Sequence, residues 1–224
     1  HGAVLSAAMN GVAAAHFPLT KLTPSDVRVT IRQLDGREVV WAEFDADDKP
    51  TPLTSASSEQ LVAAADAARE RHMPLVFALS TSGADINEGV PALHAWGRVA
   101  AALTACSGVV PTAVIVTGPA VSGPALLLGI ADLTVMTESS YAFVNGPTMV
   151  EEFTGITIGV DELGGAAHHA KQTGVATAVV SDRAAAVEMI GELLSYLPDH
   201  VDGEPTRIVS DDPPDRPCPE AGEL

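Results

Sequence analysis

Two short segments of small residues have the composition of a site that stabilises negative charge. The first, Thr81-Ser82-Gly83-Ala84, follows the apolar run at 75–80, and the second, Gly118-Pro119-Ala120-Val121-Ser122-Gly123, follows the apolar run at 112–118. Glycine, alanine and serine let a ligand approach the backbone closely. Each segment is predicted to enter a helix, where the first backbone N–H groups lack an intrahelical acceptor. Two such groups can hold the oxygen of an enolate or oxyanion.

The elements that must position these segments repeat as strand, small-residue turn and helix. Alternating residues on both sides of Asp35-Gly36 predict a hairpin over 27–45. Further strands are predicted at 75–80, 112–118, 132–137, 141–144 and 175–181, and helices at 55–72, 90–106, 124–131, 160–174 and 183–197. This order indicates an α/β fold with a parallel sheet and right-handed crossovers. Because ligands bind at the carboxyl ends of such strands, both segments are expected at the ligand-binding edge.

Composition divides the chain into three parts. We expect an N-terminal helical extension over 1–26, one α/β domain over 27–197, and a Pro- and Asp-rich linker or tail over 198–224. The chain of 224 residues is 46% hydrophobic, which is enough for one sizeable core.

Charge and cysteine content limit the class of partner and the compartment. The formal net charge of −17 argues against nucleic acid or an anionic membrane as the main partner. No apolar run approaches the ~18 residues of a membrane span, and the first residues do not have the pattern of a signal peptide. Cys106 and Cys218 are expected to be free thiols in a reducing compartment, which favours a cytoplasmic location.

Five motifs follow one another along the chain. They are STSGADINEG at 80–89, GPAVSGPALLLGIADLTVM at 118–136, SYAFVNGP at 140–147, DELGGAAHHAKQTGVA at 161–176 and DDPPDRP at 211–217. Their order and spacing resemble those of the biotin-dependent carboxyltransferases, the β-type subunits of acyl-CoA carboxylases in the crotonase (ClpP-like) superfamily. The resemblance implies a crotonase-like lobe of ββα spirals, and it covers only the N-terminal half of the usual two-lobed enzyme.

The resemblance also implies roles for individual residues. The backbone amides of Gly83 and Ala84 would stabilise the thioester enolate. The residues that would contact substrate or line the same cavity are Ser82, Ser122, Gly123, Phe143, Gly146, Pro147, Gly164, Gly165 and Ala166. The glycine motif at 164–166 would also lie near a dimer interface. No metal ligand is expected in this chain.

The implied activity is transfer of a carboxyl group between carboxybiotin and the α-carbon of an acyl-CoA. In the family, carboxybiotin releases CO2 in a dry site, its ureido nitrogen takes the α-proton, and the enolate attacks CO2. Such a site needs oriented N–H donors and excluded water rather than a catalytic dyad. The implied partners are a C-terminal-type carboxyltransferase lobe or subunit and a biotin carrier or biotin carboxylase subunit, within an oligomer.

Departures from the family pattern leave other functions open. Asp85 replaces the usual arginine, Ser82 and Ser122 replace glycine, and the loop at 45–54 lacks the usual glycine-rich turn. Hydratases of this fold use two glutamates, but Leu126 and Thr148 occupy those places. A CoA-thioester or malonyl-type decarboxylase and a non-catalytic scaffold lobe remain alternatives. The paired His168 and His169 have no third ligand at metal-binding spacing and are expected to be structural.

Overall fold

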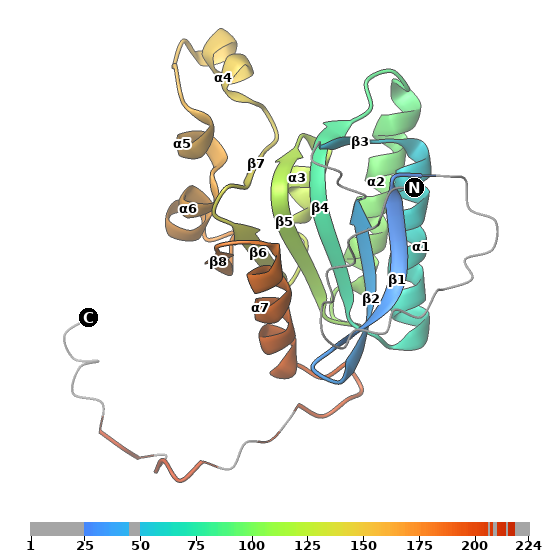
Figure 1. The fold of residues 1–224 in the computed structure, drawn as a ribbon, viewed down its shortest axis with the longest axis vertical. Coiled ribbons are helices and arrows are strands. Elements are labelled where there is room, and N and C mark those ends of the chain that lie inside the picture. The colour runs from blue at the N-terminus through green and yellow to red at the C-terminus, as the bar shows by residue number, and fades with distance from the viewer. Residues whose placement is uncertain (1–24, 45–49, 206, 208–209, 214, 218–224) are drawn as a thin grey trace, which may run out of the picture.

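A mixed β-sheet forms the centre of the fold in the computed structural model (Figure 1), which describes residues 25–44, 50–205, 207, 210–213 and 215–217. Within these residues the sheet has eight strands, in the order β1-β2-β4-β5-β6-β8, with β3 beside β4 and β7 beside β5. The strands are β1 Val27–Leu34, β2 Arg37–Phe44, β3 Thr51–Leu53, β4 Leu75–Ala84, β5 Thr112–Val121, β6 Leu133–Thr137, β7 Tyr141–Phe143 and β8 Ala178–Val180.

The hairpin and the parallel sheet are confirmed. β1 and β2 pair antiparallel, and every other pair of strands named above is parallel. Asp35 and Gly36 join β1 to β2 and have φ values of 48° and 82°. Two-residue hairpin turns need such positive φ values because only then does the turn match the twist of its strands.

Helices cover both faces of the sheet. α1 Ser55–Arg71 and α2 Val90–Cys106 lie on one face, and α7 Arg183–Ser195 lies on the other (Figure 1). Alternate residues of β4 serve the two cores, so that Phe77 packs with α1 and α2, whereas Val76 packs with α7. The order of these elements therefore follows from the apolar strands and the amphipathic helices that the sequence predicts.

The two strands that lead to the candidate site are longer than the sequence predicts. β4 continues to Ala84 and β5 to Val121, beyond the predicted ends at 80 and 118. β3 pairs with the last residues of β4, and β7 pairs with the last residues of β5, so each extension has a hydrogen-bonding neighbour. Gly83 and Ala84 consequently lie in a strand, and a loop over 85–89 separates them from α2.

The segment after β5 is also more broken than predicted. α3 Gly123–Leu127 is short, and α4 Pro147–Thr154 occupies a stretch predicted to be a loop. The predicted helix over 160–174 consists of α5 Val160–Gly164, α6 Ala166–His168 and a π-helical turn, η1 His169–Thr173. Gly165 breaks it because its backbone is extended, with φ −68° and ψ 160°. Figure 1 shows α4 and α5 standing away from the main sheet.

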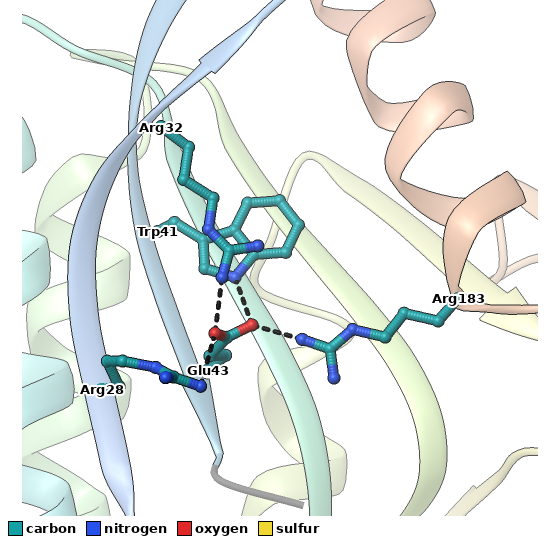
Figure 2. Close-up of polar contacts among 5 residues, drawn as sticks. All are labelled: Arg28, Arg32, Trp41, Glu43 and Arg183. Atoms are coloured by element: carbon teal, nitrogen blue, oxygen red, sulfur yellow. Dashed lines mark hydrogen bonds and ion pairs between the residues drawn. The ribbon is translucent and has the colours of Figure 1, made fainter. Parts of the chain in front are cut away.

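A buried carboxylate ties the hairpin to α7. The Glu43 side chain is 3% exposed and contacts the guanidinium groups of Arg28, Arg32 and Arg183 (Figure 2). It also accepts a hydrogen bond of 3.0 Å from Trp41 Nε1. Burial lowers the pKa of Arg32, and the Glu43 carboxylate opposes that shift. Because a buried charge is costly unless it is paired, these contacts fix how α7 begins against β1 and β2.

The structure describes little of the predicted N-terminal part and more of the predicted C-terminal part. Most of the predicted helical extension over 1–26 lies outside the described residues. The first part of the predicted tail contacts the body, since Val201 N–H donates to the Val109 carbonyl oxygen (2.9 Å) and the His200 ring stacks on His72 (3.6 Å). In the described part of the chain, no helix has the length and apolar character needed to cross a membrane.

Candidate functional site

The two small-residue segments meet at the carboxyl end of the sheet. Thr81 pairs with Ala120, and beyond this pair the strands remain in contact at Gly83. A Cβ on Gly83 would lie 3.0 Å from the Val121 carbonyl oxygen and 3.1 Å from Ser122 Cβ. Gly83 has a φ of +104°, so glycine is required here both for space and for backbone conformation. The predicted proximity of the two segments is therefore found in the structure.

The first segment presents one amide toward the second. Gly83 N–H donates to its neighbour Thr81 Oγ1 (3.2 Å), whereas Asp85 N–H donates to the Leu53 carbonyl oxygen of β3 (3.0 Å). Successive N–H groups of a strand point to opposite edges. Because the N–H of Asp85 points toward β3, the N–H of Ala84 points toward β5. Ala84 lies beyond Thr81, the last residue of β4 that pairs with β5.

The second segment presents another amide at the start of α3. Ser122 has a φ of 64°, and its N–H donates to the Phe143 carbonyl oxygen (2.9 Å). Gly123 is the first residue of α3, where an N–H has no intrahelical acceptor, and the hydrogen bonds of the described residues provide no other. A Cβ on Gly123 would lie 2.7–2.9 Å from ring atoms of Trp96, so the indole of α2 packs directly on this glycine.

The glycine motif and β7 form the adjoining wall. A Cβ on Gly164 would lie 2.1 Å from the Ala142 carbonyl oxygen, and one on Gly146 would lie 3.4 Å from the Phe143 ring. Gly165 forms a bridge with Tyr141, and Ala166 N–H donates to the Ser140 carbonyl oxygen (3.2 Å). The structure thus brings the predicted residues of 143–147 and 164–166 together around β7. Pro147 begins α4, next to Gly146.

An apolar cavity of about 310 Å³ lies between α3, β7 and α5. Its lining residues are Ala125, Leu126, Leu128, Gly129, Ala142, Phe143, Val144, Leu163, His169 and Val175. His169 is held in place, because Nε2 lies 2.8 Å from the Ala142 carbonyl oxygen and Nδ1 lies 2.9 Å from Thr173 Oγ1. Its two ring nitrogens thus bond to the protein itself. The cavity can take an apolar group about the size of a short acyl chain.

These features agree with the comparisons to known proteins. The family model described as Carboxyl transferase domain matches residues 12–224. The chain belongs to this carboxyl transferase family. The resemblance that the sequence motifs indicate is confirmed.

Two relatives of this carboxyl transferase domain bear the names of acyl-CoA carboxylase subunits. A propionyl-CoA carboxylase carboxyltransferase subunit from Haloferax mediterranei is 32% identical over 206 residues, which are 92% of this chain and 40% of the relative. A biotin-dependent acetyl-/propionyl-coenzyme A carboxylase beta5 subunit from Mycobacterium tuberculosis is 31% identical over 166 residues, 74% of this chain and 30% of that protein. The chain spans less than half the length of these relatives.

The fold has solved counterparts. A crystal structure of transcarboxylase 12S, a hexamer with hydrolysed methylmalonyl-coenzyme A bound, superposes with a TM-score of 0.79 and 29% identity. The match covers 84% of this chain and 37% of the transcarboxylase chain. The carboxyl transferase domain described here therefore has the crotonase-like α/β fold, as predicted, and corresponds to part of the larger transcarboxylase chain.

Some residues of the site were not found by sequence reasoning. Thr81 was predicted only as part of a small-residue turn, yet its hydroxyl binds the Gly83 amide. Trp96 belongs to none of the sequence motifs, yet its ring packs on Gly123. Asp85, which replaces the family's arginine, accepts from the backbone and side-chain nitrogens of Asn87 (2.9 Å each). The Trp96–Gly123 contact joins elements distant in sequence, and the other two contacts depend on the local backbone conformation, so no sequence pattern marks them.

Proposed function

We propose that this chain is the acyl-CoA-binding half of a biotin-dependent carboxyltransferase, located in the cytoplasm. The observation that carries this proposal is the contact of Gly83 with Ser122, which brings the amides of Ala84 and Gly123 to the same end of the sheet. Amides from two elements that are fixed by packing need little reorganisation as charge develops. The family membership and the acyl-CoA carboxylase relatives support the same conclusion.

The amides of Ala84 and Gly123 would hold the thioester oxygen while the α-carbon becomes an enolate. Gly83 would act through its conformation, because its own N–H already has an acceptor in Thr81. Two such amides lower the free energy of the enolate, so that the α-proton can be removed although no charged protein group contacts the thioester oxygen. Leu126 and Thr148, at the places where hydratases have glutamates, cannot exchange protons at useful pKa values.

The other predicted residues would shape the substrate site. We assign the acyl group to the apolar cavity that Phe143 and Leu126 line. Ser82 is exposed and Ser122 half-buried, and their hydroxyls would contact the thioester side of the substrate. Gly146, Pro147 and the glycine motif at 164–166 would keep β7 and Phe143 in position. Apolar walls also exclude water from the enolate.

A second lobe or subunit would complete the site. On α4 and the residues after it, Met149, Phe153, Ile156 and Val160 are 42%, 82%, 59% and 38% exposed. A cluster of exposed apolar side chains on a projecting segment is typical of an interaction surface. We assign it to a C-terminal-type lobe, which a longer chain or a separate subunit would supply, within an oligomer. Carboxybiotin, carried by a partner subunit, would supply the carboxyl group.

Reconstitution tests this proposal. The chain is combined with the second lobe, the biotin-bearing subunit, a biotin carboxylase and MgATP, which together form carboxybiotin from bicarbonate, and incorporation of labelled bicarbonate into acetyl-CoA and propionyl-CoA is measured. We expect incorporation that requires all components. Loss of malonyl-CoA without any biotin protein would instead identify the decarboxylase. Assembly of an active complex whose rate is unchanged when Gly123 is replaced by valine would favour the scaffold role.

A further inference from the structure

His169 connects the π-helical turn η1 to β7, the short strand beside the proposed enolate site. It is the first residue of η1, and its Nε2 lies 2.8 Å from the Ala142 carbonyl oxygen of β7. A carbonyl oxygen can only accept, so Nε2 carries a proton and donates it. The imidazole thus gives β7 a hydrogen bond from a residue 27 positions further along the chain.

The direction of the Ala142 carbonyl explains why β7 needs this donor. β7 has three residues, and Ala142 pairs with Ala120 of β5. The next carbonyl, that of Phe143, points toward the end of β5, where it accepts from Ser122 N–H (2.9 Å). Successive carbonyls of a strand point to opposite edges, so that of Ala142 points away from β5. Ala142 is 2% exposed, and a buried carbonyl of this kind requires a partner from the protein.

The second ring nitrogen of His169 is held as well. Nδ1 lies 2.9 Å from Oγ1 of Thr173, at the other end of η1. A general base needs a free ring nitrogen that can reach the proton it takes, and here both nitrogens bond to the protein. The bond to Ala142 needs only the proton on Nε2, which the imidazolium also carries. His169 is therefore suited to hold β7 in place and not to exchange protons with a substrate.

Two further contacts carry this restraint from β7 to the second proposed enolate donor. The Phe143 carbonyl, next to Ala142, accepts from Ser122 N–H, and Gly123 directly follows Ser122. From the other side the Trp96 ring packs on Gly123, since a Cβ there would lie 2.7–2.9 Å from ring atoms. The position of the Gly123 amide is thus set between α2 and β7.

We propose that His169 is a positioning residue for the Gly123 amide, an inference that rests on the proposed function. It acts on the reaction through Ala142, Phe143 and Ser122 and contacts none of the reacting atoms. The neighbouring His168 has no such connection, because the hydrogen bonds and ion pairs of the described residues do not include its side chain. Its ring lies edge-on to that of His169, with 6.0 Å between the ring centroids. His168 therefore provides a matched control.

Hydrogen exchange on the full 224-residue chain tests the connection without an assay of function. His169→Phe keeps a ring and removes the donor, His169→Gln keeps an N–H donor, and His168→Phe is the control. NMR should show the Ser122 amide exchanging about tenfold faster in His169→Phe, and at nearly the wild-type rate in the other two variants. Circular dichroism checks that each variant folds. Thr173→Val, at an exposed position, frees the ring without removing its donor and should give a smaller change in the same direction.

The reconstituted carboxylation assay tests the effect on the reaction. We expect His169→Phe to lower kcat about 10- to 100-fold, because a misplaced donor stabilises the enolate poorly, and to leave the KM for propionyl-CoA within about twofold. His169→Gln should recover most of the rate with an unchanged pH profile. A general base would behave differently, since glutamine would then lose as much activity as phenylalanine.

The outcomes separate the positioning role from the function on which it rests. If the Ser122 amide exchanges equally in wild type and in His169→Phe, the connection through β7 is wrong, whatever the chain does. Faster exchange with unchanged kcat, or a raised KM at unchanged kcat, would also overturn the positioning role and leave the carboxyltransferase function standing. If the wild-type complex carboxylates neither acetyl-CoA nor propionyl-CoA, the proposed function fails, and the positioning role fails with it.

Discussion

Gly83 and Ser122 are in contact although they are 39 positions apart along the chain, and the fit between them leaves no room for a Cβ on Gly83. This contact sets how closely the ends of β4 and β5 approach beyond their last pair. It also determines where the Ala84 amide lies relative to the first turn of α3. The geometry of the proposed site therefore depends on one glycine.

Replacing Gly83 by alanine should harm both stability and activity. The new Cβ would meet the Val121 carbonyl oxygen at 3.0 Å, and alanine is strained at φ +104°. We expect a loss of about 1–3 kcal/mol in the free energy of unfolding, measured by urea denaturation. The control is Gly97→Ala in α2, where nothing lies within 4 Å of the added Cβ. That change should stabilise the chain by about 0.5–1 kcal/mol, and an equal effect of both changes would contradict this account.

Replacing Gly123 by alanine should affect activity more than stability. The Cβ would meet the Trp96 ring at 2.7–2.9 Å, so the indole or the start of α3 must move. A displacement of the Gly123 amide would lower kcat by about 10²-fold, as for the loss of one oxyanion-hole donor. The reconstituted carboxylation assay measures this, and a shift in tryptophan emission reports the motion. Unchanged kcat together with shifted emission would remove Gly123 from the proposed mechanism.

Replacing Glu43 by glutamine should destabilise the fold without changing substrate specificity. Three guanidinium groups would lose the carboxylate that they share. Removing one member of a buried ion pair costs roughly 3–5 kcal/mol, and the partial exposure of Arg28 and Arg183 should reduce this to roughly 2–4 kcal/mol. Glu138→Gln, at an exposed site, is the matched control and should lie within about 0.5 kcal/mol of wild type. Chemical denaturation measures the free energy of unfolding of both variants, and equal values for the two would contradict this role of Glu43.

Cys106 should be unreactive in the folded protein. It is buried in the core, and burial raises the pKa of its thiol from 9.0 to about 11. The unfolded thiol ionises first, so the free energy of unfolding should fall as the pH rises from about 9 to about 11. In a Cys218→Ser background, iodoacetamide at pH 8 should label Cys106 slowly in buffer and quickly in urea. Fast labelling of the folded chain would show that α2 opens easily.

Much of the fold follows from the sequence alone. The alternation of apolar and polar residues on both sides of Asp35-Gly36 predicts the β1–β2 hairpin. Few residues other than glycine, aspartate and asparagine adopt the positive φ values that its two-residue turn needs. Apolar runs predict the central parallel strands, since strands buried on both faces need no polar residues. The motifs around Gly83, Gly123 and Gly164 are enough to indicate the family, because close backbone contacts leave glycine in characteristic places.

Only the tertiary structure decided how these parts form a site. β4 and β5 extend to Ala84 and Val121 because β3 and β7 supply hydrogen-bonding neighbours, and such pairing is not visible in local periodicity. The bond between Gly83 and Thr81 and the packing of Trp96 on Gly123 depend on φ, ψ and long-range contacts. Residue type therefore determined what chemistry is available, and non-local packing determined which groups can act together.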